Sequence, residues 1–238
     1  MSAIPQDERQ LIKMSSGELE ISRVRRSKAE AQETYDRISR WYDLSEGIWE
    51  KKARVVGLQK LDVKEGEIVL EVGFGTGHGI QALAQSVGES GRVYGIDLSH
   101  RMVHITQARM NEVGLSERVK LLHGDAEYLP FEAEFFDAIF MSFTLELFDT
   151  PEIPKVLSEC KRVLRSDGRI CVVSLSMTGG WNWMRELYEW GHRRFPKFLD
   201  CRPIYVRNAL VDSGFQILDT TSMSLFALPI EIVLARKG

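Results

Sequence analysis

A glycine-rich stretch, Ile68 to Gly79 (I-V-L-E-V-G-F-G-T-G-H-G), limits the possible folds of this chain more than any other feature. It begins with three apolar residues, as in a strand that is buried on both faces. Glycines follow at alternate positions, and then comes an apolar run, Ile80 to Val87, that is compatible with a helix. Strand, glycine turn and helix in this order let a backbone approach a nucleotide closely, because glycine has no Cβ to collide with it. A turn that only reverses the chain is the alternative interpretation of the motif taken alone.

Strand-like and helix-like segments alternate along the rest of the chain. Ser99 and Gly114 have the residue types expected at the two ends of a helix over 100–113. Four successive strand–helix alternations imply right-handed crossovers and a largely parallel sheet. Further strands are predicted at 92–97, 119–123, 136–143, 169–175 (after a turn at 166–168), 215–221 and 225–235, and further helices at 53–61, 151–164 and 205–211.

The predicted fold class is therefore α/β. We expect a Rossmann-like, doubly wound and mostly parallel sheet of seven strands, with an antiparallel strand near the C-terminus. Residues 1–50 are predicted to form an N-terminal helical arm or lid, and residues 51–238 the main domain. Residues 179–203, rich in aromatic and basic side chains, are predicted to be a helical insertion after the fifth strand, on the side of a second substrate.

Composition excludes several classes of partner. The formal net charge of −3 over 238 residues gives no reason to expect a nucleic-acid partner. Three cysteines cannot all pair internally and none forms a C-x-x-C motif, so a reduced, cytoplasmic setting is expected and no metal site is predicted. No apolar run approaches the roughly 20 residues needed to cross a bilayer, which leaves peripheral contact with a membrane open.

Three consecutive predicted strands end in acids, Glu71, Asp97 and Asp125. In an open parallel sheet, ligands bind outside the carboxyl ends of the strands, so these carboxylates should line one crevice. Asp97 also lies about twenty residues beyond the glycines, where a ribose-binding acid is expected. The alternative is that each acid only caps a helix.

The glycine spacing indicates which nucleotide this crevice accepts. The dinucleotide pattern G-x-G-x-x-G fails when counted from Gly73 or from Gly75, and there is no phosphate-binding G-x-x-x-x-G-K-[ST] sequence. An acid directly before the glycines would repel a pyrophosphate at the helix N-terminus. Three carboxylates instead suit a nucleoside ligand that carries positive charge and no phosphate, a description that S-adenosylmethionine meets.

On these residues the chain resembles the class I S-adenosylmethionine-dependent methyltransferases, and more narrowly the ubiquinone/menaquinone C-methyltransferase family. The matching stretches cover about Tyr35 to Leu175 in the expected order. They are V-L-E-V-G-F-G-T-G (69–77), V-Y-G-I-D-L-S (93–99), G-D-A-E-Y-L-P-F (124–131), F-D-A-I-F-M-S-F (136–143) and R-V-L-R-S-D-G-R (162–169).

The resemblance implies S-adenosyl-L-methionine as cofactor, S-adenosyl-L-homocysteine as product, and a role for each matching position. Asp97 would accept hydrogen bonds from the ribose hydroxyls, and Asp125 one from the adenine amino group. Ser142 would lie near the reactive methyl group. The remaining implied contacts are Glu71, Gly73, Gly75, Thr76 and Gly77 around the methionine portion, Leu98 or Met102 against the adenine, and the Ala126 amide at a ring nitrogen.

The segments that shape the acceptor pocket in that family depart from its pattern here. Thr144-Leu145-Glu146-Leu147 stands where the quinone enzymes have a G-x-R-N-like segment, and residues 188–203 also differ. Aromatic side chains on both sides of the core favour a hydrophobic small-molecule acceptor such as a quinol, although they could simply pack helices on the sheet. The predicted acceptor pocket contains Tyr35, Tyr42, Trp181 and Trp183.

His192 is the predicted general base, because it lies among arginines in the aromatic insertion; a surface helix position is the alternative. Other functions stay open beside a quinol methyltransferase. They are methyl transfer to oxygen, nitrogen or carbon of another small molecule or lipid, a non-catalytic module that binds S-adenosylmethionine, and an NAD-dependent oxidoreductase, which the failed dinucleotide spacing disfavours. The sequence leaves monomer and homodimer open.

Overall fold

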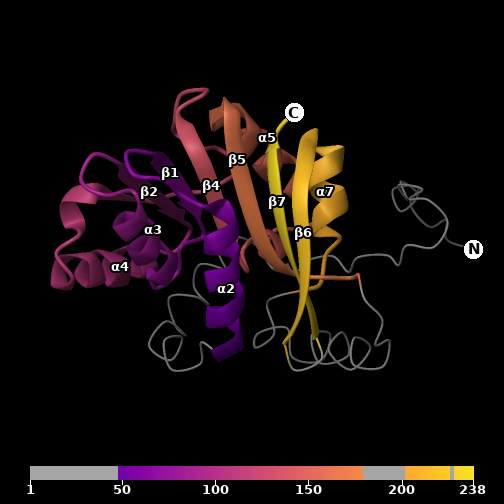
Figure 1. Ribbon diagram of the computed structural model, residues 1–238, viewed down its shortest axis with the longest axis horizontal. Helices are drawn as coiled ribbons and strands as arrows, with labels where there is room; N and C mark the ends of the chain where they lie inside the picture. Colours follow the sequence, from indigo (N-terminus) through magenta and orange to yellow (C-terminus); the bar gives the residue numbers. More distant parts are fainter. Residues whose placement is uncertain (1–47, 179–201, 226–227) are drawn as a thin grey trace, which may run out of the picture.

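A computed structural model describes residues 48–178, 202–225 and 228–238 of the chain (Figure 1). The predicted lid before residue 48 and most of the predicted insertion at 179–203 lie outside these described residues.

The described residues form one seven-stranded sheet with the order β3-β2-β1-β4-β5-β7-β6. Neighbouring strands from β3 to β5 are parallel, whereas β7 is antiparallel to both β5 and β6. The strands are β1 (Ile68–Val72), β2 (Arg92–Asp97), β3 (Val119–His123), β4 (Phe136–Ser142), β5 (Leu164–Leu175), β6 (Phe215–Leu225) and β7 (Leu228–Lys237). The predicted fold class, a mostly parallel doubly wound sheet with one antiparallel C-terminal strand, is confirmed.

Helices cover both faces of this sheet. Buried apolar residues of α5 and α7 pack on one face in a first core cluster, and those of α2, α3 and α4 pack on the other face in a second. Burial on both faces explains why the central strands are continuous apolar runs in the sequence. The helices are α2 (Ile48–Leu61), α3 (His78–Ser86), α4 (His100–Glu112), α5 (Ile153–Val163) and α7 (Val206–Asp212), with 3-10 turns η2 (Ser116–Arg118) and η3 (Leu145–Leu147).

The predicted caps of α4 are confirmed. The Ser99 hydroxyl accepts a hydrogen bond from the Met102 amide, as an N-cap does. Gly114, two residues after the helix, has a φ of +69° and donates its N–H to the Asn111 carbonyl.

The predicted start of β5 is wrong. The strand begins at Leu164, so residues 166–168 belong to it and do not form the predicted turn. Leu164 pairs with Phe136, both are fully buried, and the register with β4 then shifts before Ala138. Gly168 allows this irregularity, because a Cβ there would lie 2.7 Å from the Leu164 side chain. Residues 165–168 have no strand-pairing partner on β4 or β7 among the described residues, so Leu164 is paired ahead of an irregularity, and continuous pairing begins at Arg169, where the sequence predicted the strand to start.

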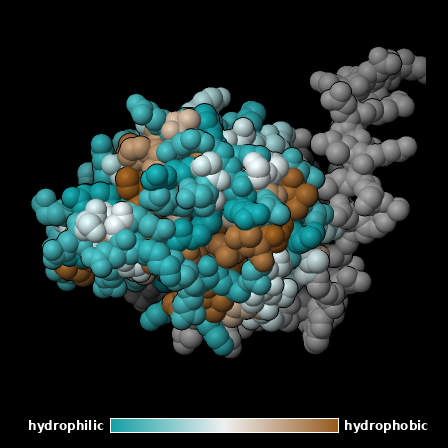
Figure 2. Space-filling view, turned by 45° about the horizontal axis from the view of Figure 1, so that its top comes forward, coloured by the Kyte–Doolittle hydropathy of each residue, from teal (hydrophilic) through white to brown (hydrophobic). Residues whose placement is uncertain are grey.

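The surface turned forward in Figure 2 is mainly hydrophilic, with separate apolar areas. The large apolar side chains exposed on the described part of the chain, Val55, Val113, Tyr128, Val211 and Leu218, are spread over separate elements. No helix within the described ranges is both long and apolar enough to cross a membrane.

Candidate functional site

The glycine loop after β1 is held at the carboxyl edge of the sheet by contacts from three directions. The Gly73 amide donates to the Ile96 carbonyl of β2 at 2.8 Å. The Thr106 hydroxyl of α4 donates to the Gly75 carbonyl at 2.9 Å, and the Thr144 hydroxyl donates to the Gly73 carbonyl at 3.2 Å. The loop is thus fixed before any ligand binds, which lowers the entropic cost of binding.

The backbone of this loop needs glycine for two different reasons. Gly75 has a φ of +53°, in the left-handed region, and a Cβ built on it meets no atom within 4 Å. The space next to Gly75 is therefore open. Gly79 instead lies against the carboxylate of Glu71, where a Cβ would be 2.1 Å from Oε1. Glu71 is only 2% exposed, so a buried carboxylate sits beside the first turn of α3, whose dipole favours negative charge.

Asp97 joins the glycine loop to the start of α4. Its Oδ2 atom accepts a hydrogen bond from the Gly75 amide and its Oδ1 atom one from the Ser99 amide, both at 2.9 Å. The carboxylate therefore lies at the junction of the glycine loop and α4, both of which it holds through backbone N–H groups.

The loop after β3 lies beside Asp97. The Gly124 amide donates to the Asp97 carbonyl at 2.9 Å, and Asp125 Oδ1 accepts from the Glu127 amide at 3.0 Å. Ala126 between them is 5% exposed. The acids predicted to line one crevice therefore lie at or just beyond the ends of three strands that are hydrogen-bonded neighbours, β1, β2 and β3.

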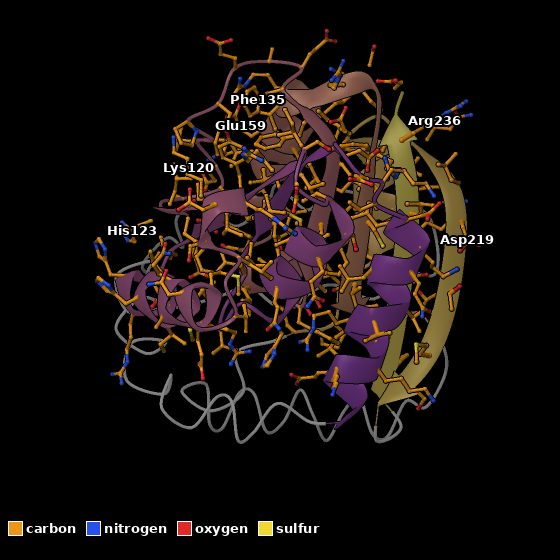
Figure 3. All side chains as sticks on the ribbon, turned by 60° about the vertical axis from the view of Figure 1, so that its left-hand side comes forward. Lys120, His123, Phe135, Glu159, Asp219 and Arg236 are labelled. Atoms are coloured by element: carbon orange, nitrogen blue, oxygen red, sulfur yellow. The ribbon has the colours of Figure 1, made fainter. Side chains whose placement is uncertain are left out.

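The other predicted cofactor contacts differ in exposure. Leu98 is half-buried, and its carbonyl lies 2.9 Å from His123 Nε2. Met102 is 2% exposed within the second core cluster, and Thr76 is 6% exposed. In Figure 3, His123 lies on the β3 side of the molecule, and Asp219 of β6 lies on the opposite side. All the described predicted contacts lie in β1, β2 or β4, or in the segments that follow β1, β2 and β3, in the β3-to-β4 half of the sheet.

Ser142 ends β4 at the same edge of the sheet. Its hydroxyl oxygen is buried and has no hydrogen-bond partner within the described ranges. Phe143 follows with a φ of +52°, which is rare for a bulky residue and indicates local strain. Thr144 then donates to the carbonyls of Ser142 and Gly73, so this segment is tied to the glycine loop.

Glu146, in η3, was not predicted from the sequence. Its side chain is fully buried; Oε1 accepts from the Leu175 amide of β5 at 3.2 Å, and Oε2 has no hydrogen-bond partner among the residues that the structure describes. Burial raises the pKa of Glu146 to about 7, against the opposing effect of nearby N–H groups and the Ser174 hydroxyl, and the negative charge of Glu50 raises it further. The signal in the sequence was a lone acid inside the apolar segment T-L-E-L-F.

Five predicted site residues lie outside the described residues. They are the predicted general base His192 and the predicted pocket residues Tyr35, Tyr42, Trp181 and Trp183.

Comparison with known proteins defines the class. Residues 69–168, from β1 into β5, match the sequence model of the family described as "Methyltransferase domain". A crystal structure of an S-adenosylmethionine-dependent methyltransferase from Aquifex aeolicus is 25% identical, with a TM-score of 0.59 over 78% of this chain and 89% of the other. Residues 69–168 are therefore similar to a methyltransferase domain, and the comparisons support S-adenosylmethionine as the cofactor.

Among its relatives, the chain resembles the demethylmenaquinone methyltransferases. The protein of that name from Lactobacillus johnsonii is 33% identical over 143 residues, which cover 60% of this chain and 56% of the relative. The chain thus matches little more than half of that relative's length.

The fold alone defines no reaction. A structure with a TM-score of 0.70 and 18% identity, over 89% of this chain and 97% of the other, is that of the [4+2]-cyclase SpnF. The residues of the site, and not the fold, determine the activity.

Proposed function

We propose that this protein transfers a methyl group from S-adenosylmethionine to a small hydrophobic acceptor of the quinol type. The observation that carries the proposal is the carboxyl edge of β1, β2 and β3, where Glu71 and Asp97 contact a preformed glycine loop that is open at Gly75, and Asp125 follows the next strand. The resemblance to demethylmenaquinone methyltransferases supports a quinol-like acceptor.

In this proposal each strand end binds one part of the cofactor. Asp97 accepts hydrogen bonds from the two ribose hydroxyls while it keeps its bonds to the Gly75 and Ser99 amides. Asp125 and the Ala126 amide bind the adenine edge. The methionine portion of the cofactor lies over Glu71 and the glycine loop. Leu98 or Met102 packs against the adenine, and Ser142 lies near the methyl group.

Methyl transfer requires alignment of acceptor, methyl group and sulfur, and alignment alone can contribute several kcal/mol. The preformed loop and the carboxylates would hold the cofactor for this purpose. Tyr35, Tyr42, Trp181 and Trp183 are proposed to enclose the acceptor, and His192 is proposed as a base; all five lie outside the described residues.

The proposed function is tested with methyl-labelled S-adenosylmethionine and a panel of acceptors that begins with demethylated quinols. We expect label in an organic-soluble product and equimolar S-adenosylhomocysteine. Label in another small molecule would keep the methyltransferase and replace the acceptor. Tight binding of S-adenosylmethionine without turnover on any acceptor would contradict the proposal and indicate a non-catalytic binding module.

Substitution of Gly75 by Ala tests whether the open space at the glycine loop holds the cofactor. The added methyl group would enter that space, so we expect affinity for S-adenosylmethionine to fall at least about tenfold, or roughly 1.4 kcal/mol, in calorimetry. Gly114→Ala is a matched control, because Gly114 also has positive φ and a Cβ there would meet nothing within 4 Å, yet it follows α4. Both changes should cost stability of about 1–2 kcal/mol from the left-handed backbone. Equal affinities of the two variants would contradict the placement.

A further inference from the structure

The end of β4 and the segment after it carry two buried oxygen atoms that have no hydrogen-bond partner within the described ranges, Ser142 Oγ and Glu146 Oε2. Buried polar atoms in folded proteins are almost always satisfied, so each such atom calls for an explanation. Both lie at the carboxyl edge of the sheet, in the chain segment whose Thr144 is bonded to the glycine loop. In the proposed function Ser142 lies near the cofactor's methyl group, so an acceptor would approach that group from this side.

Glu146 is held in place at its other oxygen. Oε1 accepts from the Leu175 amide at the end of β5, which fixes the carboxyl group between the ends of β4 and β5. A carboxyl group anchored through one oxygen can present the other to a ligand in a defined direction. A purely structural carboxyl at a fully buried position would be expected to bond through both oxygens.

From this geometry, and on the basis of the proposed function, we propose that Glu146 accepts the proton of a ring hydroxyl on the methyl acceptor. The acceptor class is then an aromatic hydroxyl compound, as a quinol is. Glu146 lies in residues 144–147, the segment that differs from the G-x-R-N-like segment of the quinone enzymes.

Protons and electrons balance in this step. The ring hydroxyl gives its proton to Glu146 Oε2, and the oxygen lone pair raises the electron density on the neighbouring ring carbon. That carbon forms a bond to the methyl group as the sulfur–methyl bond breaks, with the bonding pair left on sulfur as a neutral thioether. Glu146 then returns its proton to the ring oxygen while the methylated carbon loses its hydrogen as a proton to water. The ring is aromatic again, and one proton is released per methyl group transferred.

The electrostatic surroundings suit this role. A general base works best when its pKa lies near the working pH, and burial raises the pKa of Glu146 to about 7. On the described part of the chain, the charged side chain that acts on Glu146 is Glu50 of α2, which raises the pKa; β5 contributes the Ser174 hydroxyl and the Leu175 amide, which lower it. On β7, Glu231 is the cross-strand partner of Ser174, and its own pKa is raised by burial.

Glu146→Gln tests the proposal, because it keeps the size of the side chain and removes the base. With the full chain and the quinol that is methylated by the wild type, we expect kcat to fall at least about a hundredfold, as is typical of a lost general base. Affinity for S-adenosylmethionine should stay within about twofold. Glu231→Gln is the matched control, a buried carboxyl with raised pKa on β7 that bonds to the Ser176 hydroxyl, and it should keep its activity.

The pH profile of kcat/KM distinguishes a general base from a buried carboxyl that only supports the fold, and Glu50→Gln is the second variant that tests it. The wild-type profile of kcat/KM should rise with pH through about 7 as Glu146 ionises. Glu50→Gln removes the neighbouring negative charge, so this limb should move to lower pH. An unmoved limb would overturn the proposal, as would a Glu146→Gln enzyme with wild-type kcat.

If the wild type methylates no acceptor, the proposed function is contradicted. The role of Glu146 is then tested by measuring how tightly a ring-hydroxyl ligand binds. Calorimetry with a ring-hydroxyl ligand in the presence of S-adenosylhomocysteine compares wild type with Glu146→Gln. Binding weakened at least about tenfold in the variant would support the assignment, and equal affinity would overturn it.

Discussion

Between about pH 4.5 and 7, Glu146 alone is expected to lower the free energy of unfolding of the wild type by about 3 kcal/mol as the pH rises. The usual glutamate pKa is 4.5 and burial raises it to about 7 in the folded chain. In this window the folded state keeps the proton and the unfolded state has lost it, so raising the pH favours unfolding. The stabilising contribution is complete below pH 4.5 and is lost by about pH 7.

Urea unfolding at several pH values checks this expectation for wild type and Glu146→Gln. Other carboxyls act in the opposite direction: Arg162 lowers the pKa of Glu159, so the stability that this pair contributes is lost as the pH falls. Such contributions cancel when the free energy of unfolding of the wild type is subtracted from that of Glu146→Gln. This difference should grow in favour of the variant, from near zero at pH 4.5 to about 3 kcal/mol above about pH 7. A difference independent of pH would show that Glu146 titrates normally. Glu231→Gln should leave the Glu146 contribution unchanged.

Replacement of Asp97 by Ala is expected to weaken binding of S-adenosylmethionine by about 1–3 kcal/mol, or roughly 5- to 150-fold, because buried ribose hydroxyls would lose a charged partner. The variant also leaves the Gly75 and Ser99 amides without their acceptor, so the fold should lose some stability as well. Affinity is measured by calorimetry at a temperature where the variant is folded.

Asp137→Ala separates the two effects. Asp137 is also a half-buried aspartate that accepts a backbone N–H, from Ile68 at 2.8 Å, but it lies near the start of β4, away from the carboxyl edge. We expect Asp137→Ala to lower stability and to leave affinity unchanged. If Asp97→Ala behaves in the same way, Asp97 only organises the loop and the start of α4.

Much of the fold could be predicted from the sequence because its signals are local. Burial on both faces makes the central strand β1 an apolar run, and the acids and glycines at the ends of β1, β2 and β3 mark the carboxyl edge. The bounds of β2 and β3 are as predicted. Ser99 and Gly114 cap α4 as predicted, since capping depends on residue type over a single turn.

Contacts between distant parts of the chain decided the rest. The pairing of Leu164 with Phe136 adds a strand start ahead of the irregularity at residues 165–168, and no local pattern indicates this pair. Thr106 and Thr144, which hold the glycine loop, lie 31 and 71 residues from their partners and have no local pattern. Glu146 likewise bonds to a distant residue, the Leu175 amide, 29 residues away. The lone acid in T-L-E-L-F is visible in the sequence, but its burial between two strand ends is not, and that burial is the main reason why its pKa rises to about 7.

By itself, then, the sequence determined the sheet, the loop and the class of cofactor, because these follow from periodicity, glycine spacing and the charge of strand ends. Only the tertiary structure decided which side chains hold that loop and which carboxyl is buried between the ends of β4 and β5. Hydrogen bonds and desolvation depend on neighbours in space, and the chain order does not specify them.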